Sequence, residues 1–147
     1  RLTGCTFEDC ELSALRLDGS HVHDTRFLRC KLRAVDWRAA AGLRGVVFED
    51  CVLDEGGFAE LDLAELVARR CSFRDAVLQG ARLRKADLRG SDLSGATFTG
   101  ADLRGADLRD ATGYALDPVA TKLAGARVSL PEALTLLDAL GLRVEGA

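Results

Sequence analysis

The sequence is poor in aromatic residues and proline, and it has no long apolar run. Its 147 residues include no methionine, one tryptophan, one tyrosine, six phenylalanines and two prolines. No apolar stretch approaches the roughly 18 residues of a membrane span, and no signal segment opens the chain. The five cysteines are odd in number and form no CxxC pair, which favours a reducing compartment. We therefore expect a cytoplasmic protein.

Neither positive nor negative charge predominates, and the common catalytic motifs are missing. Lysine and arginine number 20 against 23 aspartate and glutamate, giving a formal net charge of −3. This balance indicates neither a strongly basic, nucleic-acid-binding protein nor a strongly acidic one. The sequence has no GxGxxG, no Walker-type loop, no GxSxG and no HExxH. We expect no enzyme, no cofactor and no catalytic residue.

What the sequence does have is a period of five residues through most of its length. The clearest units are 86–90, 91–95, 101–105 and 106–110, which read ADLRG, SDLSG, ADLRG and ADLRD. A large apolar residue stands at the centre of every unit except the one centred on Ala68. These predicted core residues include Phe7, Phe27, Phe48, Phe73, Phe98, Leu88, Leu93, Leu103 and Leu108. One extra residue falls within 38–40 and shifts the frame by one, as a bulge or longer corner would.

This periodicity matches neither a helix, which needs a spacing of 3.6, nor an ordinary strand, which needs two. The chain resembles the pentapeptide-repeat family, A(D/N)LXX, over roughly residues 1–112. The resemblance implies an all-β fold, a right-handed quadrilateral β-helix of about five to six coils with four units to a coil. We expect this β-helix to span 1–128, decaying after 111, and a C-terminal helix and tail to occupy 129–147.

Units four apart stack into columns in such a coil. Phe7, Phe27 and Phe48 then share one column, and the small position of another holds Cys10, Cys30, Cys51 and Cys71, continued by Ser91. The cysteines allow two interpretations. A ladder of small buried side chains is favoured, because stacked thiols point the same way and do not converge on one metal ion. A metal or redox site remains the alternative.

Two histidines, His21 and His23, flank the inward Val22 and would project from the same outer face. A metal site there would need further ligands, and the stacked units offer Thr3 on one side and Arg44 on the other. Arg44 argues against a cation. We therefore predict no metal site. The recurring aspartates of the repeats, such as Asp87 and Asp102, are expected to be structural.

The C-terminal segment carries the signature of a short helix. Ser129 and Glu132 form a capping box, the helix extends to about Leu140, and Gly141 is the stop. An apolar stripe, with Leu136 off it, is expected to cover the open end of the β-helix: Leu130, Leu134, Leu137 and Leu140. The segment resembles the dimerisation module of the gyrase-binding pentapeptide-repeat proteins of mycobacteria. That resemblance implies a homodimer through the C-terminal helix.

Three functions remain open. A non-enzymatic scaffold that binds an unidentified protein needs nothing beyond the repeat. The family resemblance implies an alternative, a DNA mimic that binds DNA gyrase or another type II topoisomerase and protects it from quinolone-like inhibitors. That alternative requires an acidic face, and Arg82, Arg84 and Lys85 make one patch basic. Metal binding or redox chemistry through cysteine or histidine is the third. No direct binding of nucleic acid or membrane is expected.

Overall fold

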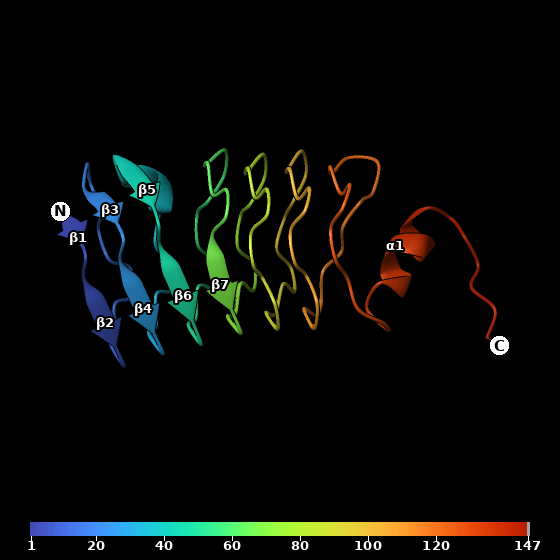
Figure 1. The fold of residues 1–147 in the computed structure, drawn as a ribbon, viewed down its shortest axis with the longest axis horizontal. Coiled ribbons are helices and arrows are strands. Elements are labelled where there is room, and N and C mark those ends of the chain that lie inside the picture. The colour runs from blue at the N-terminus through green and yellow to red at the C-terminus, as the bar shows by residue number, and fades with distance from the viewer. Residues whose placement is uncertain (147) are drawn as a thin grey trace.

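The computed structural model describes residues 1–146 and shows a rod of stacked coils, with the N-terminus at one end and a short helix at the other (Figure 1). Parallel pairing links each coil to the next. Six pairing steps connect Thr6 to Arg127, at intervals of 20 or 21 residues, through Arg26, Val47, Val67, Asp87 and Asp107. Three further columns of parallel bridges complete a four-sided β-solenoid.

The regular strands lie on two of the four sides. One sheet joins β1 (Leu2–Thr3), β3 (His21–His23) and β5 (Gly42–Arg44). The other joins β2 (Thr6–Glu8), β4 (Arg26–Leu28), β6 (Val47–Glu49) and β7 (Val67–Arg69). Beyond β7 the pairing continues as single bridges, such as Val67 with Asp87. Each coil is therefore held to its neighbours on several sides at once.

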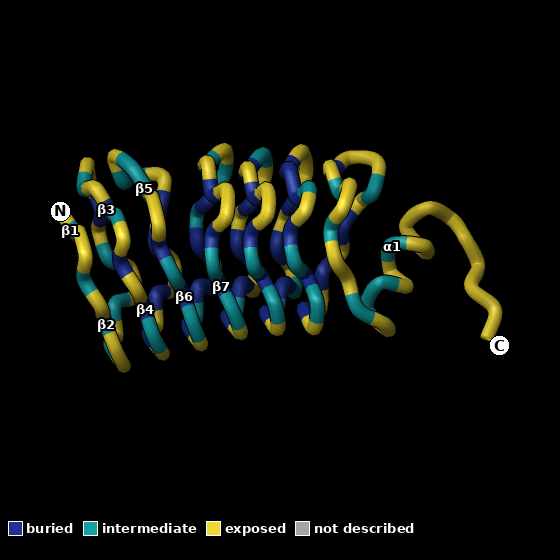
Figure 2. The backbone as a smooth tube through the Cα atoms, in the orientation of Figure 1, coloured by how far each residue is buried: buried dark blue, intermediate teal, exposed yellow. Residues whose placement is uncertain are grey.

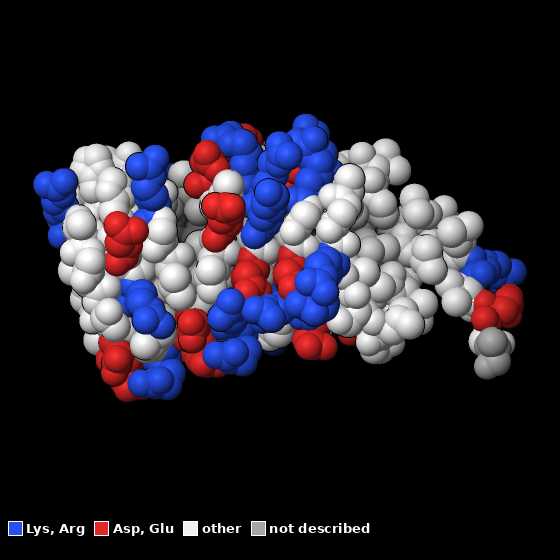
Figure 3. Space-filling model, viewed as in Figure 1, with Lys and Arg blue, Asp and Glu red and all other residues white. Residues whose placement is uncertain are grey.

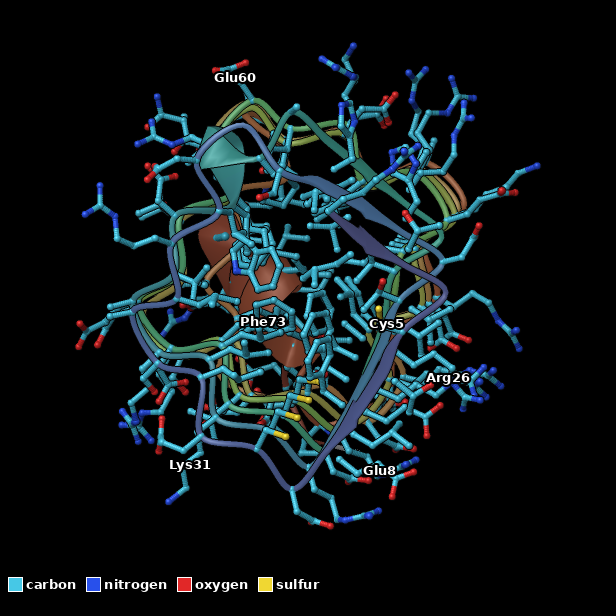
Figure 4. The ribbon with its side chains drawn as sticks, turned by 90° about the vertical axis from the view of Figure 1, so that its left-hand side faces the viewer. Cys5, Glu8, Arg26, Lys31, Glu60 and Phe73 are labelled. Carbon is cyan, nitrogen blue, oxygen red and sulfur yellow. The ribbon has the colours of Figure 1, made fainter. Side chains whose placement is uncertain are left out.

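The core is one column of side chains along the axis of the rod. In Figure 2 the buried residues recur at the same places in every coil, and in Figure 4 Phe73 points inward while Glu8, Arg26 and Lys31 point outward. The central residues Leu53, Leu83 and Leu103 are wholly buried. Each such side chain contributes on the order of 1.5–3 kcal/mol before conformational entropy is subtracted. Two inward residues in every five explain why the period is neither that of a helix nor that of a strand.

The predicted phenylalanine column is confirmed. The rings of Phe7 and Phe27 are stacked with centroids 5.3 Å apart, and those of Phe27 and Phe48 are also 5.3 Å apart. Trp37 meets Phe48 edge-on at 5.2 Å and stacks on Phe58 at 5.9 Å. The N-terminal half of the rod is thus packed by aromatic rings. Alanine and leucine fill the same space in the C-terminal half, where Ala86 and Leu88 are buried.

The extra residue of the sequence lies in a 3-10 helix, η1 (Trp37–Ala39), at one corner of the rod. Pairing intervals are 21 residues across this point, as for Asp36 with Gly57, and 20 elsewhere, as for Gly57 with Val77. After the corner the chain enters β5, which pairs with β3 on one side. On its other side β5 has no parallel partner among residues 62–64 in the described part of the chain. The rod is open at that place.

The C-terminal segment departs from its prediction in two ways. The helix α1 is shorter, Leu134–Ala139, and Ala133 rather than Ser129 precedes it. The side chains of Ser129 and Glu132 cap no helix. They accept hydrogen bonds from the backbone N–H groups of Asp110 (3.2 Å) and Gly113 (3.1 Å), on the preceding coil. The predicted capping box is wrong because the open edge of the last coil offers competing donors.

The predicted covering stripe is wrong as well. Leu130, Leu134, Leu137 and Leu140 are exposed, from 37% for Leu137 to 76% for Leu130. Leu136, which the pattern left off the stripe, packs against the core instead. The stop at Gly141 is confirmed: its φ is +77°, and the N–H groups of Gly141 and Leu142 donate to Asp138 and Leu137. No helix in residues 1–146 is long and apolar enough to cross a membrane.

Candidate interaction surfaces

On the outer surface of the N-terminal coils, ion pairs join each coil to the next. Arg29 Nε lies 2.8 Å from Asp9 Oδ1, and Arg70 Nε lies 2.9 Å from Asp50 Oδ1. The charges alternate from coil to coil. Because both partners are exposed to water, each pair contributes little to the stability of the fold. The pairing fixes the register of the coils and leaves little unbalanced charge on this side.

In the C-terminal coils the recurring aspartates pair within their own unit. Arg104 donates to Asp102 through Nε (2.9 Å) and Nη2 (2.7 Å), and Arg109 does the same for Asp107. The hydrogen bonds from Arg104 lower the pKa of Asp102 to about 2. These aspartates are held as ionised, hydrogen-bonded structural groups, as the sequence predicted. Their geometry offers no carboxyl group poised to gain or lose a proton near neutral pH.

Asp87 shows the same arrangement with a third partner. Burial opposes ionisation of this carboxyl, but hydrogen bonds from Arg89 and from Arg69 on the preceding coil lower its pKa well below the ordinary range. The Arg69 Nε–Asp87 Oδ2 distance is 2.6 Å. Figure 3 shows the result, with positive and negative side chains interspersed along the rod on the visible face. That face presents no continuous acidic stripe.

The predicted cysteine column is a ladder of buried thiols. Cys30, Cys51 and Cys71 are buried and Cys10 is half-buried, and all are free thiols. The Cys30 thiol donates to the Phe7 carbonyl of the preceding coil at 3.3 Å. Ser91 continues the column in the same way, with its hydroxyl donating to the Ala68 carbonyl at 2.9 Å. The side chains of this column therefore tie one coil to the next.

The acidity of two of the three buried thiols, Cys30 and Cys71, fits a structural role, whereas the hydrogen bond with Cys71 lowers the pKa of the Cys51 thiol to about 7. Burial raises the pKa of the Cys30 thiol. The neighbouring Cys51 thiol, together with burial, raises the pKa of Cys71. A protonated, buried thiol is a poor nucleophile and a poor metal ligand. Across residues 1–146 no group of three or more histidine, cysteine, aspartate or glutamate side chains is placed to hold a metal ion.

The two histidines stand side by side on the outer face, as predicted. Their ring centroids are 5.5 Å apart, and His23 is in register with Thr3 on one side and Arg44 on the other. The next coil presents Gly42 opposite His21, which leaves room above the rings. Arg44 beside His23 places a positive charge next to the pair. The arrangement thus provides two imidazoles and a cation, without a third ligand.

The exposed apolar side chains gather at the C-terminal end. Within 128–144 the exposed large residues are Val128, Leu130, Leu134, Leu137, Leu140, Leu142 and Val144. The remainder of the described chain has only Val77 and Val119 in this class. Figure 2 shows that the chain beyond α1 is exposed, whereas every coil contains buried residues. Sequence reasoning selected four of these leucines but assigned them to the covered side of the helix.

Part of the repeat matches a known protein family. Residues 71–110 match the model described as pentapeptide repeats, with eight copies. Residues 71–110 therefore consist of pentapeptide repeats. The eight matched repeats cover coils with a regular interval of 20 residues, and the same pairing extends to Thr6 on one side and Arg127 on the other. No curated protein sequence matches the chain.

Solved pentapeptide-repeat structures are similar to the chain at low identity. QnrB1, a plasmid-mediated fluoroquinolone resistance protein, is 16% identical with a TM-score of 0.34, over 98% of this chain and 99% of its own. A pentapeptide repeat protein from the cyanobacterium Cyanothece is 21% identical, with a TM-score of 0.29, over 87% and 86%. One from the Arabidopsis thaliana thylakoid lumen is 25% identical, with a TM-score of 0.36, over 80% and 61%.

Proposed function

We propose that the chain is a non-enzymatic scaffold that binds other proteins and pairs with a second copy of itself through its C-terminal segment. The observation that carries this proposal is the gathering of exposed apolar side chains in 128–144. Contiguous exposed apolar surface on a soluble protein is typical of a protein–protein interface. The coils behind it form a rigid rod, which is suited to presenting surface rather than to enclosing a substrate.

A two-fold pairing fits this surface. In a closed dimer the same patch of both copies meets itself, so one apolar stripe is sufficient to build the interface. Leu134 and Leu137 lie one turn apart on α1 and are both about two-fifths exposed, at 39% and 37%. Leu136 anchors the opposite side of the same helix to the core. The stripe is thereby held in a fixed orientation, which lowers the entropic cost of association.

The test is the mass of the chain in solution, measured by light scattering during gel filtration. We expect a dimer for the wild type and a monomer for the double variant L134E/L137E. Val77→Glu is the matched control, because Val77 is 42% exposed but lies on a side of the rod. It should remain dimeric. A wild type that is monomeric at every concentration, or a V77E variant that dissociates equally, would contradict the pairing.

Binding of DNA gyrase as a DNA mimic is a second candidate. Its support is the C-terminal segment, whose resemblance to the mycobacterial dimerisation module agrees with its exposed apolar stripe. The charges weigh against it, because duplex DNA carries one negative charge per roughly 1.7 Å of its axis. Here Asp87, Asp102 and Asp107 are each neutralised by an arginine. A gyrase supercoiling assay decides: no inhibition and no quinolone protection at micromolar protein would remove this candidate.

A further inference from the structure

One side of the rod has a slot between its third and fourth coils. β5 belongs to the third coil, and its partner in the fourth would be residues 62–64. No backbone hydrogen bond joins these two segments in the described chain, whereas the next pair of coils is fully bonded there. In that next pair the Leu63 N–H donates to the Arg82 carbonyl at 2.7 Å, and the Glu65 N–H donates to the Arg84 carbonyl at 2.9 Å.

Because these bonds are missing, backbone groups on both edges of the slot lack partners across it; we call these edges, β5 and residues 62–64, its two lips. Leu43 and Gly45 occupy the register of Leu63 and Glu65, and their N–H groups find no carbonyl of the fourth coil. Unpaired strand edges of this kind accept a further strand readily. Figure 1 shows β5 standing apart from the following coil on this side of the rod. The slot is thus bordered by two strand edges that face each other.

The space between the lips is a cavity of about 530 Å³. Phe48 and Phe58, which are buried core residues, contribute to its lining. Leu43 on one lip is only half-buried, although the corresponding Leu83 of a closed coil is fully buried. The cavity therefore gives an incoming side chain direct access to the apolar core. Its size is within the range of pockets that hold small ligands, roughly 300–1,000 Å³.

The slot is rigid because the neighbouring sides of the same two coils are closed. On the side that precedes β5 and residues 62–64, the Trp37 N–H donates to the Gly57 carbonyl at 3.0 Å. On the side that follows, the Asp50 N–H donates to the Arg69 carbonyl at 3.0 Å. Among the described residues at this level, the β5 side is the open one, so the slot is about one five-residue unit long. It has room for a short extended segment and not for a helix, which is about 10 Å wide.

The charges on the lips differ in sign. Arg44 stands on the β5 lip, and Asp62 and Glu65 stand on the opposite lip, all three exposed. None of the three forms an ion pair within residues 1–146. At the equivalent position of other units, Arg70 is paired with Asp50, whereas Glu55 forms no ion pair among the described residues. This edge thus presents two carboxylates to whatever occupies the slot, and the basic residues Arg82, Arg84 and Lys85 lie behind it on the next coil.

We propose that this slot binds an extended segment of a partner protein, which enters as an additional strand between β5 and residues 62–64. This rests on the proposed protein-binding function and names its surface. Backbone hydrogen bonds to both lips supply the affinity. Alternate side chains point to opposite sides of a strand, so an apolar one enters the cavity and a basic one lies outside, beside Asp62 and Glu65. The preferred segment therefore alternates apolar and basic residues.

The probes are two capped, fluorescent heptapeptides, one alternating valine with lysine and one alternating valine with glutamate. Binding to the full chain is followed by anisotropy. The lysine peptide should bind about three- to tenfold more tightly, because exposed charge pairs are individually weak. The double variant D62K/E65K should lose or reverse this preference. Glu55→Lys is the matched control, since Glu55 and Glu65 hold the same position in their units, with φ of +59° and +61°. It should bind like the wild type.

A second measurement locates the peptide. The amides of Leu43 and Gly45 should exchange with deuterated solvent quickly in the free chain and slowly once the lysine peptide is bound. Absence of saturable binding, or equal losses in E55K and D62K/E65K, would overturn the proposal. A fall in oligomer mass caused by D62K/E65K would also overturn it, because a second copy would then fill the slot. A dimer that persists while the peptides fail to bind would defeat this inference alone and leave the scaffold function standing.

Discussion

Asp102 and Arg104 form a two-point contact on the outside of the rod, with Arg104 Nε 2.9 Å from Oδ1 and Nη2 2.7 Å from Oδ2. The backbone N–H of Arg104 donates to the same carboxylate at 3.2 Å. The Asp102 side chain is 12% exposed, so these bonds are largely shielded from water. Asp102→Asn should therefore lower the free energy of unfolding by about 1 kcal/mol at pH 7, measured by urea denaturation.

The same contact predicts a pH dependence with a definite sign. The pKa of Asp102 falls from 3.8 to about 2 on folding. Its ionised form contributes stability above pH 3.8, and that contribution disappears as the pH falls towards 2. The wild type and D102N should therefore differ in stability at pH 7 and converge near pH 2. A difference that persists undiminished at pH 2 would rule out ionisation as its cause.

Phe27 has a stacked ring on both sides, whereas Phe7 has one on a single side and is half-buried. Phe27→Ala should cost about 3–5 kcal/mol, because the surrounding coils collapse only partly into the space. Phe7→Ala should cost clearly less. Since each coil contacts only its neighbours, either loss should be confined to the N-terminal end of the rod. Urea denaturation gives the totals, and equal costs would contradict this packing.

A side chain at position 113 would be unfavourable for two reasons, so glycine is required there. Its φ is +73°, and an added Cβ would lie 3.0 Å from the backbone nitrogen and 3.1 Å from the Cα of Ser94 on the preceding coil. Gly100 has a similar φ of +72° but open space around it. Gly100→Ala should cost about 1–2 kcal/mol through backbone conformation alone. Gly113→Ala should destabilise the protein more, so its thermal unfolding midpoint should be lower than that of Gly100→Ala. Equal midpoints for the two variants would mean that the two coils can move apart at Gly113 without cost.

The five thiols should divide into two classes in their reaction with a thiol reagent. Cys5 and Cys10 are partly exposed and should react within minutes in the native chain. Cys30, Cys51 and Cys71 are buried and should react only when the rod opens. Mass spectrometry after timed labelling identifies each site. Rapid modification of Cys51 in the native state would show that its part of the ladder opens locally.

The core of the rod was predictable from sequence because every unit repeats the same two inward positions. Once the period was found, the stacking of Phe7 on Phe27 and the ladder from Cys30 to Ser91 followed from counting residues. The extra residue near Ala39 was visible for the same reason. Its consequence was not, because whether one side of a coil stays open depends on how all four sides close in space.

The C-terminal segment could not be oriented from its pattern. An apolar stripe indicates that a helix has a side to bury, but it does not say against what. Here Leu136 meets the core, while Ser129 and Glu132 are drawn to the free N–H groups of Asp110 and Gly113. Those donors belong to the edge of the last coil, 19 residues earlier in the chain, and a local capping rule takes no account of them.

The open side at β5 also divides the rod mechanically. Everywhere else along the fully wound part, neighbouring coils are joined on several sides, but between β5 and residues 62–64 one of those joints is missing. A pulling force applied to the two ends would concentrate at this level and part the rod there first. The two blocks released, one closed by aromatic rings and the other by leucine and alanine, would each retain their own wound core.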